Sequence, residues 1–158
     1  MIQYLLTLVA SMTPLVEFRM AIPFGVSLGV PVWHSVLMSI IGGLIATKLL
    51  LFFLPKIIDF ARNHWVWLDK KLAYLLKRTE KMHSKKMQNI GFFGMVFFVL
   101  LPIPGSGAYT SVLLAYIFRW PYNRSWLAIS LGIILGSGLI GIITQSGLSI
   151  WHYIQSFL

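Results

Sequence analysis

The hydrophobic residues of this chain gather into blocks of two different lengths. Two blocks, residues 33–54 and 125–148, are long and almost entirely apolar. As helices, each would cover about 33 Å or more, which matches the roughly 30 Å hydrocarbon core of a bilayer. The pattern therefore predicts two transmembrane helices over these ranges.

The apolar blocks at 89–101 and 108–118 are shorter, and the segment PIPGSG lies between them. As helices they would cover only about 20 and 16 Å, so neither would span a bilayer. Broken backbone at membrane depth is tolerated only where protein buries it or water reaches it. We predict a re-entrant helical hairpin with PIPGSG at its tip; the alternative is one kinked span over 90–118.

Residues 2–30 show the same pattern of a short apolar block and a break. The block IQYLLTLVASM is followed by TPLVEFRMAIPFG, which contains Pro14, Glu17, Arg19, Pro23 and Gly25. Proline inside a helix removes a backbone donor and clashes with the preceding turn. We therefore predict a second re-entrant hairpin over this segment.

The two halves of the chain match each other at an offset of 90 residues. This offset pairs Pro14 with Pro104 and Pro31 with Pro121, and it aligns PVWHSVLMSIIGG with PYNRSWLAISLGI without a gap. Two prolines and one whole span share the same offset. The match therefore predicts an internal repeat.

We expect the whole chain, residues 1–158, to form a single membrane domain. Residues 1–54 would be the first repeat and residues 89–158 the second, with residues 55–88 as a basic connecting loop. The net charge is +9, and nine of the 13 Lys and Arg residues lie in this loop: Lys56, Arg62, Lys70, Lys71, Lys77, Arg78, Lys81, Lys85 and Lys86. Such clustering is typical of a cytoplasmic loop and argues against a nucleic-acid-binding surface.

Within the basic loop, residues 64–88 place apolar side chains at roughly helical spacing, with lysines at the other positions. This pattern predicts a helix in the cytoplasmic membrane interface, anchored by Trp65 and Trp67. Such a helix would contact membrane lipids and could bind anionic headgroups. The alternative is a solvated positive loop.

The positive charges also orient the two spans. The first span ends at the basic loop, whereas the second span follows Arg119 and Arg124, so the two spans run in opposite directions. The fold class we predict is an all-α integral membrane protein made of two inverted-topology repeats. Each repeat is a re-entrant helical hairpin followed by a transmembrane helix, an architecture typical of secondary transporters.

Glu17 is the only acidic residue outside the basic loop, and Arg19 lies two positions after it. An ionisable residue in a membrane-embedded segment is a candidate functional group by default. Two readings stay open. The carboxylate could bind substrate or carry a proton across the membrane, or the two residues could form a pair that only locks the hairpin tip. Lys48, near the end of the first span, is expected to extend toward the cytoplasmic face.

The offset of 90 residues places Glu17 opposite Gly107, where a second half-helix would begin. If the hairpin tips met, free N–H groups and the positive end of the helix dipole would favour a phosphate or carboxylate there. Hydroxyl groups at the tip could add donors: Ser106, Tyr109, Thr110 and Ser111. The alternative is that Gly and Ser serve only the tight turn.

Several classes of protein are disfavoured. The chain has no cysteine, and it shows no metal-ligand cluster, no Ser/His/Asp constellation and no nucleotide-binding loop. We expect no enzymatic activity, no metal and no cofactor.

The segments VEFRMAIPFGV and LPIPGSGAYTSVLLAY resemble the two signature segments of a bacterial family, the putative small multidrug export proteins. Glu17, Arg19, Ile22 and Pro23 match the first signature. The second is matched by Pro102, Pro104, Gly105, Ser106, Gly107 and Ala108. The resemblance covers most of the chain outside the basic loop. It implies transport across the bacterial cytoplasmic (inner) membrane by a multi-pass protein.

That family is similar to the wider DedA-like superfamily. There the resemblance implies paired re-entrant hairpins and a transport or lipid-flipping role, with a polyprenyl phosphate carrier as one substrate. The chain departs from the DedA pattern because it lacks the arginine pair beside the second hairpin. Its nearest candidates, Arg119 and Arg124, come after that hairpin.

The function we predict is a transporter or lipid flippase for a small anionic or amphipathic substrate, with protons as a coupling ion. The residues assigned to substrate or proton binding are Glu17, Arg19, Pro23, Pro102, Pro104, Gly105, Ser106, Gly107, Tyr109 and Thr110. The alternative is a non-transporting membrane scaffold or a small pore-forming protein. Two spans and two hairpins are too few to enclose a pathway, so we expect a homodimer.

Overall fold

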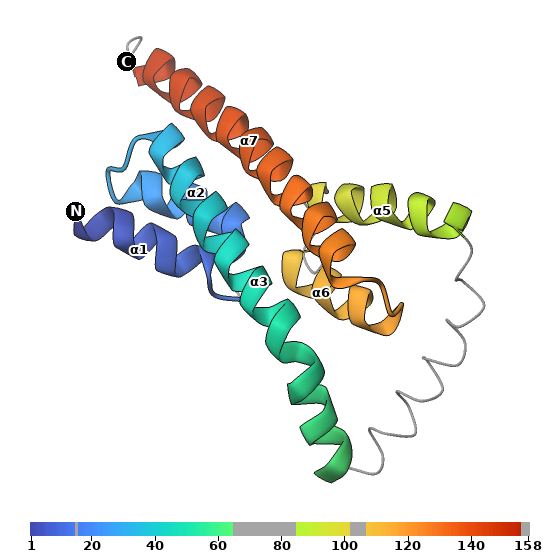
Figure 1. Ribbon diagram of the computed structural model, residues 1–158. Helices are drawn as coiled ribbons and strands as arrows, with labels where there is room; N and C mark the ends of the chain where they lie inside the picture. Colours follow the sequence, from blue (N-terminus) through green and yellow to red (C-terminus); the bar gives the residue numbers. More distant parts are fainter. Residues whose placement is uncertain (15, 65–84, 102–106, 156–158) are drawn as a thin grey trace. The chain divides into compact units, whose positions relative to one another are not determined.

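The computed structural model describes residues 1–14, 16–64, 85–101 and 107–155. The described residues form six α-helices and no strand (Figure 1). The helices are α1 (Ile2–Ser11), α2 (Glu17–Ser27), α3 (Val32–His64), α5 (Lys85–Leu100), α6 (Ala108–Ile117) and α7 (Tyr122–Gln155). The predicted all-α class is confirmed. The expected interfacial helix falls mainly on residues 65–84 and lies outside the described residues.

Helices α3 and α7 are the two elements long and apolar enough to cross a membrane. Their apolar parts are Val32–Ile58, with 27 residues, and Tyr122–Ser149, with 28 residues. At 1.5 Å per residue each covers about 40 Å, more than the bilayer core requires. The two predicted spans are therefore confirmed as long apolar helices, and each is a few residues longer than the sequence pattern indicated. They suggest a membrane protein.

The other described helices are too short to span. Helix α1 has 10 residues and α2 has 11; α6 has 10, and the apolar part of α5 is Gly91–Leu100. Helix α1 contacts α2, and α5 contacts α6. The blocks on either side of PIPGSG are thus two separate helices.

The break in the first hairpin lies earlier than the sequence suggested. Pro23 and Gly25 were expected to interrupt the chain, but both lie inside α2, and the described non-helical residues before it are 12–14 and 16. Pro23 is exposed, and a short helix in a bundle tolerates the lost backbone donor because neighbouring elements hold it in place. Gly25 belongs in the helix for a packing reason given below.

Helices α2 and α6 end in the same way. Gly29 has a left-handed backbone with φ of 86°, and Arg119 has φ of 49°. The Val30 N–H donates to the Gly25 carbonyl at 3.0 Å, and the Trp120 N–H donates to the Ala115 carbonyl at 3.0 Å. These are the 6→1 bonds of a Schellman motif. The second bonds of the motif, Gly29 N–H to Val26 O and Arg119 N–H to Tyr116 O, are present as well.

The helices that follow also begin at matching positions. Helix α3 begins at Val32 and α7 begins at Tyr122. The first bonds of the two helices run from the N–H of Ser35 to the Pro31 carbonyl at 3.0 Å and from the N–H of Ser125 to the Pro121 carbonyl at 3.1 Å. Residues that correspond at the offset of 90 therefore share local backbone structure as well as residue type.

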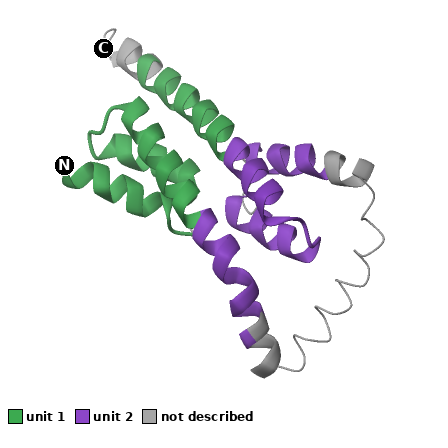
Figure 2. Cartoon of the chain, in the orientation of Figure 1, with its two compact units in different colours: residues 1–46, 133–158 green, residues 47–132 purple. Residues whose placement is uncertain are grey.

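The chain divides into two compact units (Figure 2). Unit 1 contains residues 1–46 and 133–158, and unit 2 contains residues 47–132. Each unit holds one pair of short helices and a part of each long helix. The sequence predicted a different division, into two consecutive repeats that end at residue 54 and begin at residue 89. That division into repeats stays a prediction.

In unit 1, Gly25 lets three helices approach closely. A Cβ atom at this position would lie 2.6 Å from Oγ1 of Thr7 on α1 and 2.7 Å from Oγ of Ser35 on α3. Helix α2 can pack against both neighbours only because residue 25 has no side chain. An apolar cluster centred on Ile22, Val32 and Val36, with Ile40 and Ile140 packed against it, completes this core.

In unit 2, Gly132 serves a similar purpose for α5 and α7. A Cβ atom there would lie 2.6 Å from Cβ of Val99 and 3.0 Å from the carbonyl oxygen of Val96. Gly91 lies directly against the Trp120 ring. Small residues allow close backbone approach between membrane helices, so Gly132 lets α7 pack closely on α5.

Candidate functional site

Glu17 begins α2 and has an unusual backbone. Its φ is 50°, a left-handed value that L-residues other than Gly, Asn and Asp rarely adopt. Its N–H donates to the Thr13 carbonyl at 3.0 Å, and its side chain is half-buried. Such a conformation costs about 1–3 kcal/mol and is typical of functional sites. The negative charge suits the first turn of a helix.

Arg19 is half-buried in the same turn and interacts with Glu17. Burial lowers the pKa of the Arg19 guanidinium from its usual value, and the Glu17 carboxylate opposes that shift. The guanidinium carbon also lies 5.2 Å from the ring centroid of Phe18. Residues two apart in a regular helix point away from each other, but the left-handed Glu17 departs from regular helix geometry. Both readings of this pair, a site for substrate or protons and a pair that only locks the tip, stay predictions.

Pro23, the third predicted residue of this motif, lies one turn further along α2 and is exposed. It lies at least seven positions after the described non-helical residues, which are 12–14 and 16. Its place in the helix gives it no direct part in the geometry around Glu17.

Four residues of the second motif, Pro102, Pro104, Gly105 and Ser106, lie outside the described residues. Gly107 is the N-cap of α6, with extended backbone (φ −78°, ψ −179°) and no side-chain cap. Tyr109 and Thr110 lie in the first turn and are half-buried. As expected, a helix begins directly after Gly107.

Ser111 differs from the expectation. Its hydroxyl donates to the Gly107 carbonyl at 3.1 Å, and its N–H donates to the same oxygen at 3.1 Å. The side chain is fully buried. The hydroxyl is therefore engaged within the first turn of α6, where Ser commonly bonds back to the preceding turn.

At the offset of 90 residues, Glu17 and Gly107 occupy the same place in the two hairpins. Each lies where the second short helix begins. The first hairpin has a carboxylate there, and the second has backbone alone. Glu17 and Arg19 belong to unit 1, whereas Gly107, Tyr109 and Thr110 belong to unit 2.

Buried hydroxyl groups in unit 1 were not singled out by the sequence. Thr7, Ser11, Ser35 and Ser39 are all fully buried. Thr7 and Ser11 donate to backbone carbonyls of α1 at 2.9 and 2.7 Å. The hydroxyls of Ser35 and Ser39 have no hydrogen-bond partner. The spacing of four residues between these two serines was a visible signal, because it places both on one face of a helix.

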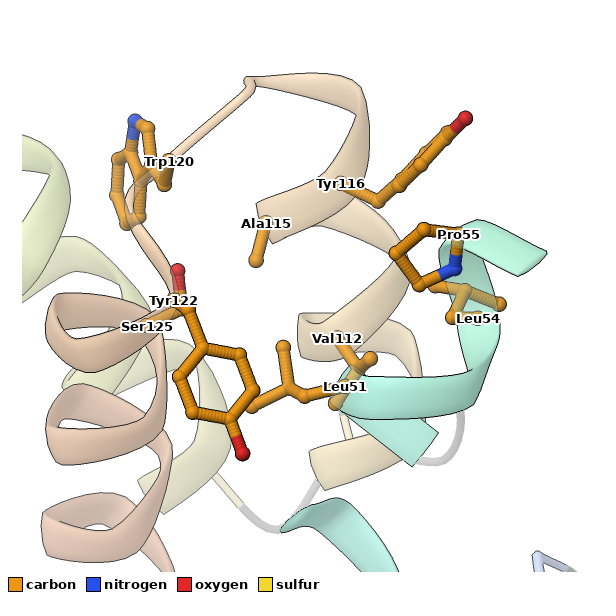
Figure 3. A pocket seen from close by; sticks show the side chains of 9 residues that line it. All are labelled: Leu51, Leu54, Pro55, Val112, Ala115, Tyr116, Trp120, Tyr122 and Ser125. Atoms are coloured by element: carbon orange, nitrogen blue, oxygen red, sulfur yellow. The ribbon is translucent and has the colours of Figure 1, made fainter. Parts of the chain in front are cut away.

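Unit 2 contains a cavity of about 120 Å³ (Figure 3). It is lined by Leu51, Leu54 and Pro55 of α3, by Val112, Ala115 and Tyr116 of α6, and by Trp120, Tyr122 and Ser125. A cavity of comparable size in a protein core can admit a benzene ring. This cavity could not be predicted from the sequence, because its walls come from segments more than fifty residues apart.

Comparison with known proteins links the chain to one family. A family model described as putative small multi-drug export protein matches residues 17–140. That range begins at Glu17 and includes both motifs, all of α3 and the first part of α7. No curated protein and no solved structure gave a significant match.

Proposed function

The chain belongs to the family of putative small multi-drug export proteins, and on that premise we propose that it is a membrane transporter or flippase. Its substrate is a small anionic or amphipathic molecule, and protons are the coupling ion. It resides in the bacterial cytoplasmic membrane, with the basic loop at residues 55–88 on the cytoplasmic side. The proposal also includes a homodimer as the working assembly.

The observation that carries this proposal is the charged start of α2. Glu17 and Arg19 interact there within an otherwise apolar segment, and Glu17 has a left-handed backbone. Ionisable groups at membrane depth are costly and are retained mainly where they bind substrate or carry protons. In this proposal Arg19 is the fixed cation for the substrate, and Glu17 exchanges a proton.

The architecture we propose is a pair of inverted-topology repeats, each with a re-entrant hairpin. Three observations support it: two short packed helices before each long helix, matching helix ends at an offset of 90 residues, and the location of the positive charges. Discontinuous helices in inverted repeats are typical of binding sites in secondary transporters.

The second motif and the cavity of unit 2 have roles in the same proposal. In this proposal the start of α6, with Gly107, Tyr109 and Thr110, presents its N–H groups and the positive end of its dipole to an anionic group. Pro102, Pro104, Gly105 and Ser106 complete that motif by sequence. The apolar lining of the cavity (Figure 3) suits the hydrocarbon part of an amphipathic substrate.

The test is transport by purified protein in liposomes, with and without a pH gradient. Three probes are used: fluorescent phosphatidylglycerol, the anionic dye calcein and the cationic dye ethidium. We expect movement of an anionic probe that depends on the gradient, and its loss in Glu17→Gln. Glu80→Gln is the matched control, because it makes the same chemical change in the basic loop.

Other outcomes would contradict the proposal. Release of both dyes regardless of charge would indicate a pore, and no movement of any probe would indicate a non-transporting scaffold. Wild type and Glu17→Gln could also show equal gradient-dependent transport. That result would contradict the proposed role of Glu17 but not the proposal that the protein is a transporter.

A further inference from the structure

Lys48 lies inside the first apolar span, where its ammonium group packs over an aromatic ring. Its Nζ is 5.2 Å from the ring centroid of Trp126, and both residues belong to unit 2. Among the described residues of this unit, Asp59 is the acidic one. It lies eleven positions further along α3, which corresponds to about 16 Å of helix. The Lys48 side chain is exposed on α3 within the apolar range Val32–Ile58, and a cation in an apolar span calls for an anionic partner.

Two further hydrogen-bond donors, both on α7, have no hydrogen-bond partner. The indole Nε1 of Trp126 and the hydroxyl of Ser130 are both buried and make no hydrogen bond. Ser130 is only 8% exposed. Residues four apart share one helix face, so the two groups lie within one turn of each other. Each unmade bond of a buried polar group is costly and calls for an explanation.

The other half of the chain provides an internal comparison. At the offset of 90 residues, Trp126 and Ser130 correspond to Val36 and Ile40, and Lys48 corresponds to Gly138. Val36 and Ile40 pack in the apolar cluster of unit 1. In unit 1, aliphatic side chains thus occupy the positions that correspond to Trp126 and Ser130. Helix packing alone therefore does not require polar groups at these positions. The three polar residues of unit 2 call for a different explanation.

We propose that Lys48, Trp126 and Ser130 form a binding site for a phosphate group. An ammonium and an indole N–H are donors only, so the group that satisfies them must be an acceptor. An anion also neutralises the charge of Lys48, which a water molecule does not. Three donors from two helices suit the several oxygens of a phosphate, to which lysine binds as a point charge.

The phosphate can come from solution or from a lipid headgroup, and the experiment separates these sources. The protein carries ¹⁵N-labelled tryptophan and is placed in dodecyl maltoside micelles, which contain no phosphate; Trp126→Phe identifies the indole signal of Trp126. One arm adds inorganic phosphate, and the other adds phosphatidylglycerol to the micelles. We expect the Trp126 signal to shift in at least one arm.

The variants test the assignment of each group. Lys48→Gln is expected to weaken the response about tenfold or more, Ser130→Ala to weaken it less, and Lys48→Arg to retain it. Lys56→Gln is the matched control. Lys56 also lies on α3 above aromatic rings, 4.6 Å from the centroid of Phe52, but it is outside the proposed site, so its variant should respond like wild type.

Two results would overturn the proposal: a Trp126 signal that shifts in neither arm, or one that shifts equally in wild type and Lys48→Gln. A shift in the phosphate arm alone identifies a free anion as the ligand, and a shift in the lipid arm alone identifies a headgroup. The site does not depend on the proposed transport. The Glu17→Gln protein should give the same titration, so failure of one idea is distinguishable from failure of the other.

Discussion

Gly29 and Arg119 adopt the same left-handed backbone at the ends of α2 and α6, 90 residues apart. Both complete a Schellman motif with the same two hydrogen bonds. Glycine suits this conformation because it has no Cβ atom, whereas arginine adopts it at a cost. The two halves of the chain therefore end their second short helix with the same motif but with different residues.

This relationship predicts opposite effects of two substitutions on stability. Arg119→Gly should increase the free energy of unfolding by about 0.5–1 kcal/mol, because it removes the steric cost of the left-handed position. Gly29→Ala should lower it by about 1 kcal/mol or more for the converse reason. Reversible unfolding by dodecyl sulfate in mixed micelles measures both. Changes of the same sign would contradict the shared motif.

Gly25→Ala tests the packing of unit 1. The added methyl group would lie within 2.7 Å of the hydroxyls of both Thr7 and Ser35, so helices must move apart. We expect the free energy of unfolding to fall by about 1–3 kcal/mol. Gly138→Ala is the control, since a Cβ atom there has nothing within 4 Å. If the two variants were equally stable, Gly25 would not be the point of close approach.

Gly132→Ala makes the corresponding test in unit 2. A Cβ atom would lie 2.6 Å from Cβ of Val99, and this neighbour is a β-branched side chain with little freedom to move aside. We expect a loss of about 1–3 kcal/mol, and the same Gly138→Ala control applies. An unaffected unfolding midpoint would show that α5 and α7 do not rely on this contact.

The proposed inverted topology predicts that two corresponding residues lie on opposite sides of the membrane. Pro31 and Pro121 are both exposed, each directly before a long helix. Because the chain has no cysteine, Pro31→Cys and Pro121→Cys give single labelling sites without background. An impermeant maleimide applied to intact cells should label residue 31, and residue 121 should react only after lysis. Labelling of both from the same side would rule out the inverted arrangement.

The homodimer is tested by counting subunits. Two spans enclose no pathway by themselves, so we expect two copies per functional unit. Photobleaching of singly labelled protein in dilute liposomes should show predominantly two steps. Single-step bleaching at every dilution, in liposomes that still transport, would establish a monomer.

Much of the fold could be predicted from the sequence because its signals are local. The two spans follow from unbroken apolar blocks long enough for a bilayer, and the start of α6 follows from Gly107 after two prolines. Pro23 was misleading because proline weakens a helix without always ending one. Packing around Gly25 keeps that segment helical.

Only part of the candidate site could be predicted from the sequence. Glu17 and Arg19 could be found from the sequence, because a lone acid in an apolar segment is conspicuous and its cation lies two residues away. The left-handed backbone of Glu17 could not be found, since nothing in the residue type favours it.

The order of the residues establishes where the chain is apolar, where it breaks, and where its two halves correspond. Which distant residues meet is known only from the packing of the helices. Lys48 and Trp126 are 78 positions apart, yet they form one contact, and the orphan hydroxyl of Ser130 is visible only once the helices are packed. Periodicity and turn chemistry act between neighbours along the chain. Contacts between helices depend on the rotation and depth of each helix, which no short stretch of sequence encodes.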